Sequence, residues 1–293
     1  MWFFAALSSA VFYSIKNILE KVFVHKVDKY ILALSVRLFA MPLFLIPLLI
    51  NPDLIIGFHE LPLKFWLATI YVSAIATPVE MIFFYKALQG EQISYLIPLL
   101  AFSPVITSIF GYIFFREVPS FLGFMGILLI VSSVYILNIS KVKESIFEPF
   151  KRLSGNKSVR YLSVMMISYS IGIVIDKVAI SGANFYYYAF VNYLFVSINL
   201  FIIALYKAKS KLSQIRTNIK PFMAIGIIIA IYTLLRLYAL QSSPSSYVAS
   251  IMASSTIFTT IFGLIILKEN NFKTKIIVAG VATLGMVLIK LSH

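Results

Sequence analysis

The chain has 293 residues, of which 60% are hydrophobic and only 12% are charged, and its mean hydropathy is +0.94. Soluble proteins place about a quarter of their residues in charged positions, so this composition excludes a soluble fold and indicates one that is embedded in lipid. The net charge of +14 does not indicate nucleic-acid binding, because the basic residues lie in short clusters between apolar spans. The lack of cysteine excludes disulfides, thiolate metal sites and a cysteine nucleophile.

Ten apolar segments follow one another along the chain, each near the roughly 20 residues that cross a bilayer. The first has no basic leader, so it is interpreted as a membrane helix rather than a cleaved signal. The predicted spans are approximately residues 2–24, 30–50, 64–86, 92–115, 118–139, 160–181, 184–206, 221–241, 245–267 and 274–291. The expected fold class is therefore an all-α integral membrane protein with ten transmembrane helices.

A basic linker at residues 141–159 separates two predicted units, 1–140 and 160–293, of five helices each. The units repeat. Ala87-Leu88-Gln89, Tyr95, Gly111 and Glu117 recur 152 positions later as Ala239-Leu240-Gln241, Tyr247, Gly263 and Glu269, and Tyr13-Ser14 with Glu20-Lys21 match Tyr169-Ser170 with Asp176-Lys177 at an offset of 156. Because each unit has an odd number of helices, the second enters the membrane from the opposite side, which predicts inverted repeats of the kind found in transporters.

These motifs resemble the drug/metabolite transporter superfamily, in its EamA-type branch of two five-helix repeats. The first copy carries the resemblance in Arg37, Tyr85 to Leu88, Leu99 to Pro104 with Gly111, and Arg116-Glu117 before Gly123 and Gly126; the second keeps Ala239-Leu240, Gly263, Lys268-Glu269 and Gly280. The second copy departs in having Thr256 where Pro104 would recur and no basic counterpart of Arg37. The resemblance implies a ten-helix transporter but no particular substrate.

The basic residues also predict the orientation. The face that receives the connections after the odd-numbered spans carries 18 Lys and Arg, whereas the other carries three, Lys64, Arg116 and Lys290. Because cytoplasmic loops hold the excess of basic residues, the linker is predicted to be cytoplasmic and both termini to lie outside, in the cytoplasmic membrane of a prokaryote. The family resemblance alone would place the termini inside.

Charged residues within spans mark candidate functional positions, because they are expensive to place in lipid. Counted at 1.5 Å per residue, Lys16, Glu20, Arg37 and Glu80 lie roughly 6 to 12 Å from the linker face, and Asp176 and Arg236 lie roughly 7 to 8 Å from the opposite face. Uncharged polar residues, Tyr13, Asn17, Tyr169, Asn192 and Tyr232, are predicted between these levels. Each of them is open to two interpretations, contact with substrate or ordinary packing.

The charged residues leave two interpretations open as well. In the structural one, Arg37 pairs with Glu80 or Glu20, Asp176 pairs with Arg236, and the lysines, including Lys177, extend to the headgroups. In the functional one, a carboxylate that is removed from water between helices exchanges a proton as the cavity alternates between faces. Glu80 is the better candidate for that role because it lies deeper than Glu20.

Two further features carry alternatives. Pro78, Pro98 and Pro104 free backbone carbonyls and mark either moving parts or static kinks. Glu117 and Glu269 close two helices at the membrane surface, where capping or pairing is expected more than contact with cargo.

The function predicted from these features is a secondary transporter, an exporter of a small metabolite such as an amino acid or amphipathic amine, driven by a proton or other gradient. There is no nucleotide-binding loop and no metal-ligand spacing, so no cofactor, metal or catalytic residue is assigned. An intramembrane enzyme acting on lipid-linked substrates, and a channel or structural membrane subunit, remain alternatives. A monomer suffices for the inverted pair, and a homodimer stays open.

Overall fold

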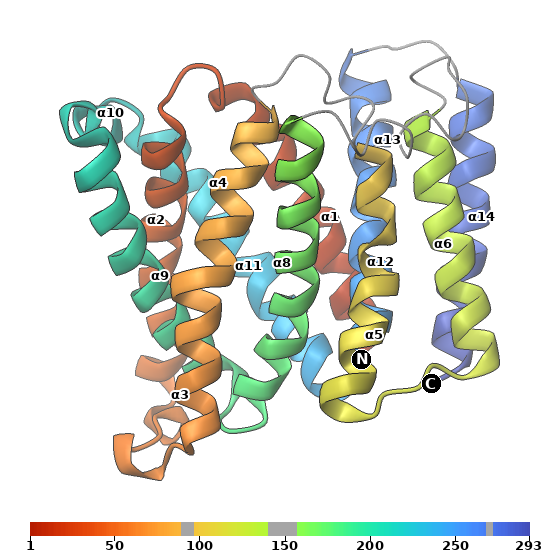
Figure 1. Ribbon diagram of the computed structural model, residues 1–293, viewed down its shortest axis with the longest axis horizontal. Coiled ribbons are helices and arrows are strands. Elements are labelled where there is room, and N and C mark those ends of the chain that lie inside the picture. Colours follow the sequence, from red (N-terminus) through yellow and green to blue (C-terminus); the bar gives the residue numbers. More distant parts are fainter. Residues whose placement is uncertain (89–96, 140–156, 268–271) are drawn as a thin grey trace.

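The computed structural model describes residues 1–88, 97–139, 157–267 and 272–293, and these form a bundle of helices with no strand in the described ranges (Figure 1). The basic linker at 141–156, the Gln89 to Tyr95 part of the repeat and the Lys268-Glu269 motif lie outside them. The α-helices of the first half are α1 (Trp2–Phe23), α2 (Lys29–Ile50), α3 (Leu63–Ile70), α4 (Thr77–Leu88), α5 (Ser103–Phe115) and α6 (Phe121–Ile139). Those of the second half are α8 (Lys157–Ile180), α9 (Phe185–Ala208), α10 (Ser213–Thr217), α11 (Ile219–Ser242), α12 (Ser245–Ala253), α13 (Ser255–Leu267) and α14 (Phe272–Leu291).

Within the described ranges, six helical stretches are long and apolar enough to cross a membrane, namely Trp2–Phe23, Lys29–Ile50, Leu63–Lys86, Arg160–Ile180, Phe185–Lys211 and Ile219–Ser242. Shorter apolar helices are Leu100–Phe115, Phe121–Leu137 and Ile277–Leu291. The all-helical membrane class predicted from the composition is therefore confirmed, whereas the number of ten spans stays a prediction.

Three of the predicted spans change helix type or break within the described residues: the fourth, where the 3₁₀ segment η5 (Ile97–Phe102) precedes α5, and the third and ninth. In the third, the π-helical segment η3 (Tyr71–Ala76) joins α3 to α4 directly before Pro78. Proline has no N–H to donate and its ring crowds the preceding turn, and a wider π turn accommodates both. In the ninth, α12 ends at Ala253 and α13 begins at Ser255, with the Ser254 amide shared between the carbonyls of Ser250 and Ile251.

Short 3₁₀ turns occupy several connections: η1 (Pro52–Leu54) and η2 (Phe58–Glu60) between α2 and α3, η5 (Ile97–Phe102) before α5, and η7 (Lys209–Lys211) after α9. Both chain termini lie at the same end of the bundle, the lower end in Figure 1, which is called the terminal face below.

Helices from the two halves pack against one another throughout the bundle. Extensive contacts join α1 with α11, α2 with both α9 and α11, α4 with α8, α5 with both α8 and α12, and α6 with α14. The approach of α6 to α14 needs glycine on both helices. A Cβ on Gly126 of α6 would lie 2.6 Å from the carbonyl oxygen of Gly285 on α14, and one on Gly285 would lie 2.8 Å from that of Gly126. The two backbones therefore touch directly.

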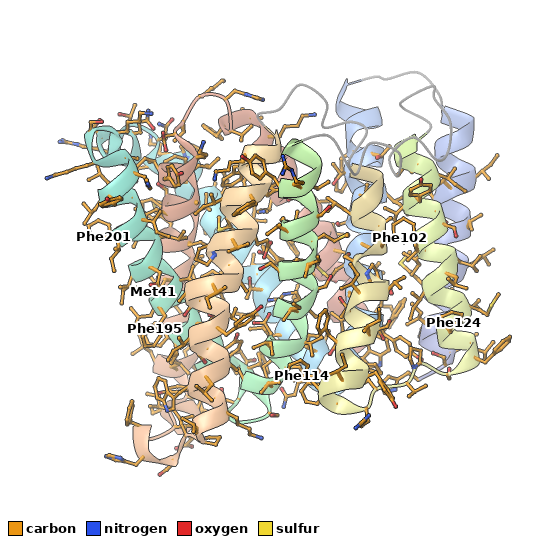
Figure 2. All side chains as sticks on the ribbon, viewed as in Figure 1. Met41, Phe102, Phe114, Phe124, Phe195 and Phe201 are labelled. Atoms are coloured by element: carbon orange, nitrogen blue, oxygen red, sulfur yellow. The ribbon has the colours of Figure 1, made fainter. Side chains whose placement is uncertain are left out.

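Apolar side chains cover the outside of the bundle as well as its core. Large hydrophobic residues such as Phe114, Phe124 and Phe201 are exposed on the outer helix surfaces (Figure 2). In water such a surface would cause aggregation. In a membrane it is the surface that is expected to face the lipid. The polar side chains of the spans turn inward instead, where they line the cavity described next.

Candidate functional site

A polar cavity of about 60 Å³ lies in the middle of the bundle. It is lined by eight of the residues that depth and polarity single out in the sequence, Tyr13, Arg37, Glu80, Tyr169, Asp176, Asn192, Tyr232 and Arg236. Tyr193, Thr77 and Met252 contribute to the same wall, along with small and apolar residues of η3, α8 and α9. This volume is smaller than the roughly 300 Å³ or more that ligand sites usually measure.

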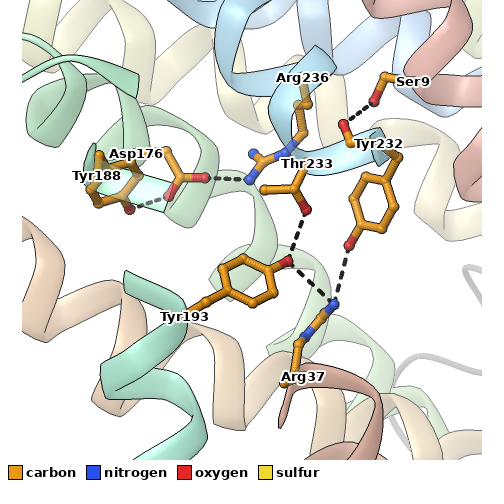
Figure 3. Close-up of polar contacts among 8 residues, drawn as sticks. All are labelled: Ser9, Arg37, Asp176, Tyr188, Tyr193, Tyr232, Thr233 and Arg236. Carbon is orange, nitrogen blue, oxygen red and sulfur yellow. Dashed lines mark hydrogen bonds and ion pairs between the residues drawn. The ribbon is translucent and has the colours of Figure 1, made fainter. Parts of the chain in front are cut away.

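Arg37 on α2 is buried in the cavity wall and has tyrosines rather than a carboxylate as neighbours. Its Nη1 donates to the hydroxyls of Tyr193, at 3.4 Å, and Tyr232, at 3.3 Å (Figure 3). The guanidinium carbon lies 5.5 Å from the centre of the Tyr193 ring, and Nε has no hydrogen-bond partner. The prediction that Arg37 pairs with Glu80 or Glu20 is therefore wrong, because within the described residues no carboxylate reaches it.

Asp176 on α8 and Arg236 on α11 form the ion pair that the sequence predicts. Arg236 Nη2 lies 2.8 Å from Asp176 Oδ2, and Tyr188 on α9 donates its hydroxyl to Asp176 Oδ1 (Figure 3). The pair is nearly enclosed, with 5% of the Asp176 side chain and 15% of the Arg236 side chain exposed. Each charge therefore compensates the other, and three helices are held together at the cavity.

Glu80 on α4 lines the same cavity but makes no hydrogen bond or ion pair within the described part of the chain. Asn192 on α9 is likewise incomplete, because its buried Oδ1 has no partner. The cavity thus holds one compensated ion pair and two opposite charges, Arg37 and Glu80, that are not in contact with each other.

Three of the predicted site residues lie away from the cavity. Lys16 Nζ forms an ion pair with Glu20 Oε2 at 2.8 Å, one helical turn along α1, and also contacts Asn17 Oδ1 at 3.3 Å. Lys16 and Glu20 are both buried. Lys16 therefore does not extend to the headgroups as the structural interpretation has it, because its carboxylate partner is close by on the same helix.

Sequence reasoning missed several residues that contact the predicted site residues. Tyr193 shares a hydrogen bond of 2.8 Å with Thr233 of α11 while it accepts from Arg37, and Ser9 of α1 donates to the carbonyl of Tyr232 at 2.8 Å. Tyr13 and Tyr232 meet edge to face, with ring centres 5.3 Å apart. Tyr193 is one tyrosine among 17, so composition alone gives no signal for it, although it adjoins Asn192.

The side chains of the cavity are suited to recognising charge. The described residues contain no group of three or more His, Asp or Glu that could hold a metal, and no histidine lines the cavity. Its chemistry is that of hydrogen bonding, ion pairing and cation–aromatic contact.

A multi-span helical bundle around a buried charged cavity is typical of membrane carriers. The model of the EamA-like transporter family matches the chain twice, over residues 1–139 and 157–291. The chain belongs to this family, which makes it a membrane transporter of the drug/metabolite type.

One solved crystal structure superposes on the chain with a TM-score of 0.76 at 11% sequence identity, covering 98% of this chain and 96% of the other. At that identity the likeness shows the fold alone. None of the curated proteins matches the sequence.

Proposed function

We propose that the protein is a secondary transporter that exports a small metabolite by alternating access between two inverted repeats of five transmembrane helices. The substrate class that fits the cavity best is a zwitterion of amino-acid type, with a carboxylate and an ammonium group. An amphipathic amine fits less well. The direction of transport rests on the family alone.

The observation that carries this proposal is the pair of uncompensated opposite charges in the cavity. Arg236 already has Asp176 at 2.8 Å, whereas Arg37 has only neutral hydroxyl partners and Glu80 has none among the described residues. A buried charge without a counter-charge is costly. A ligand with a carboxylate for Arg37 and an ammonium for Glu80 would compensate both at once, while an amine or an acid would leave one of them unpaired.

The helix pairing supports the inverted repeat. If the two halves are exchanged, the α2–α9, α5–α12 and α6–α14 pairs each map onto themselves, and the α1–α11 pair maps onto α4–α8. A pseudo-two-fold axis in the membrane plane produces this pattern. It also provides two equivalent conformations, in which the halves exchange roles and the cavity opens to opposite faces.

Glu80 is proposed as the residue that couples transport to a proton gradient. It lies in the cavity and has no protein partner in the described chain to fix its charge. When Glu80 is protonated it loses its attraction for an ammonium group, so proton binding and substrate binding compete at one carboxylate. Competition of this kind is sufficient for exchange of a proton against a substrate.

The experiment is solute counterflow in proteoliposomes with labelled amino acids, amines, sugars and nucleotides, each with and without an imposed pH gradient. Neutral amino acids are expected to accumulate, and the pH gradient is expected to increase the accumulation. In Glu80→Gln, counterflow of the amino acid should weaken and its response to the pH gradient should disappear, because glutamine keeps the shape but loses both the negative charge and the titration.

Asp28→Asn, a substitution at a surface ion pair with Lys211, is the matched control and should behave as wild type. If a class accumulates but Glu80→Gln responds to the gradient as wild type does, the coupling role of Glu80 is wrong. If no solute exchanges in vesicles that contain folded protein, the carrier proposal itself is wrong.

A further inference from the structure

A further ion pair, partly buried, lies outside the cavity, between Lys177 near the end of α8 and Glu117 beyond the end of α5. Lys177 Nζ is in contact with Glu117 Oε1, and the two side chains are 18% and 12% exposed. This pair joins the first half of the chain to the second. Lys177 therefore does not extend to the headgroups as the sequence suggests, because Glu117 holds it.

The same two side chains also cap two helix ends. Lys177 donates to the carbonyl of Ser243, directly after α11, and Glu117 Oε2 accepts from the backbone N–H of Ser245, the first residue of α12, at 2.8 Å. A cation at a helix C-terminus and an anion at a helix N-terminus both match the helix dipole. The ion pair thus fastens the connection between α11 and α12 to α5 and α8.

The local backbone holds Glu117 in this position. Arg116 adopts a left-handed conformation with φ of 55°, and the Glu117 amide donates back to the carbonyl of Gly111 at 3.3 Å, which ends α5 in a tight reversed turn. A Cβ at Gly111 would lie 2.9 Å from Glu117 Oε2. The carboxylate therefore lies over the last turn of α5 in a space that glycine leaves open.

The helix that is fastened in this way is a separate short element of the ninth predicted span. α12 is short, and five of its nine residues are serine or alanine: Ser245, Ser246, Ala249, Ser250 and Ala253. Small side chains let α12 approach its neighbours closely. At its far end, the break at Ser254 separates α12 from α13.

α12 reaches from this ion pair to the cavity. Ser245 contacts Glu117, and Met252, seven residues or roughly 10 Å along the helix, lines the cavity wall. On α8, Lys177 directly follows the cavity residue Asp176. The ion pair therefore lies between the cavity and the terminal face.

We propose that Glu117 and Lys177 form a latch that holds α12 closed over the cavity on the terminal face, and that transport requires the latch to open with α12 pivoting at Ser254. While the ion pair is intact, α12 is fastened at one end and hinged at the other. When the pair separates, α12 keeps its connection at Ser254 and loses the charged attachment that Glu117 and Lys177 give it.

The test uses the absence of cysteine in the chain. A single cysteine at Thr77, which lines the cavity from α4 and is not part of the latch, reports access to the cavity. A membrane-impermeant maleimide is supplied only to the side that bears the chain termini, which a terminal tag identifies. This measurement needs no substrate, so its result is independent of whether the carrier proposal holds.

In Thr77→Cys alone, labelling from the terminal face is expected to be slow. Adding Glu117→Gln or Lys177→Met should accelerate it by about tenfold or more, which is the change in the open population that the loss of one charge-assisted hydrogen bond gives. The double variant should label about as fast as the faster single variant, because the two residues act as one unit. Asp28→Asn at the surface ion pair is the control and should leave the rate unchanged.

Two results would overturn the latch. One is an unchanged labelling rate in both Glu117→Gln and Lys177→Met while their thermal midpoints show folded protein. The other is acceleration from both faces alike, which would mean that the variants loosen the whole bundle rather than open one end of it.

Discussion

At the scale of single residues, what distinguishes the charged side chains of this protein is whether each has a partner. Asp176 and Arg236 compensate each other, as do Lys16 with Glu20 and Lys177 with Glu117. Arg37 and Glu80 both line the cavity, but neither forms an ion pair in the described part of the chain. The functional proposal rests on this difference, since compensated pairs stabilise the bundle while uncompensated charges remain available to a ligand.

Removing one partner of a compensated pair is expected to cost stability. Asp176→Asn leaves Arg236 buried without a counter-charge and weakens the contact with Tyr188, so the free energy of unfolding should fall by about 3 to 5 kcal/mol. Asp28→Asn should cost less than about 1 kcal/mol, because Lys211 is 52% exposed and asparagine can still cap α2 through the Tyr30 amide.

Thermal unfolding in detergent, followed by circular dichroism, compares the two variants with wild type. Equal midpoints for Asp176→Asn and Asp28→Asn would contradict a structural role for the buried pair.

The residue scale also shows the limit of reading depth from the sequence. Counting residues gives the height of a side chain in the membrane, so Asp176 and Arg236 were placed at one level and do pair. Height does not give the direction around the helix axis, which depends on the neighbouring helices. For this reason the partners of Arg37 were predicted as Glu80 or Glu20, whereas the structure places Tyr193 and Tyr232 beside it.

At the scale of helices, hydropathy located the apolar segments but not their interruptions. The span predicted at 64–86 contains the π-helical segment Tyr71–Ala76, and the span at 245–267 contains the break at Ser254. Both are local changes in the backbone hydrogen-bond pattern, which a sliding average of apolarity cannot detect. Pro78 gave a signal for the first, while serine at 254 gave none for the second, because serine is tolerated within helices.

The close contact between α6 and α14 leads to a prediction at the scale of helices. Gly126→Leu should separate the two helices, because even a Cβ at this position would lie 2.6 Å from the Gly285 carbonyl oxygen and 2.7 Å from Ile289 Cγ1. A loss of about 1 to 3 kcal/mol is expected, as for other overpacked cores.

Gly280→Ala on the same α14 is the matched control, since no atom lies within 4 Å of its Cβ position. It should be neutral or stabilising by up to about 1 kcal/mol. Comparison of thermal midpoints checks both variants, and a Gly126→Leu protein as stable as Gly280→Ala would show that the close approach of the helices contributes little.

At the scale of the whole molecule, composition and internal repetition predicted the class of protein and its family. The match of the family model to 1–139 and again to 157–291 confirms the resemblance seen in the motifs around Glu117 and in the recurring Ala-Leu-Gln. The orientation with both termini outside, the count of ten spans and the oligomeric state stay predictions. They depend on the membrane and on other chains, whereas the cavity depends only on how this chain folds.

The central claim is that the separated charges of Arg37 and Glu80 select the cargo. Its most direct test is counterflow of a neutral amino acid and of the amine that lacks its carboxylate, measured side by side in wild type and in Arg37→Gln. Wild type should prefer the amino acid, and Arg37→Gln should lose that preference, because the variant no longer provides a positive partner for the carboxylate. If Arg37→Gln, present as folded protein, transports both solutes in the wild-type ratio, the carboxylate does not bind at Arg37 and the account of the cavity is wrong.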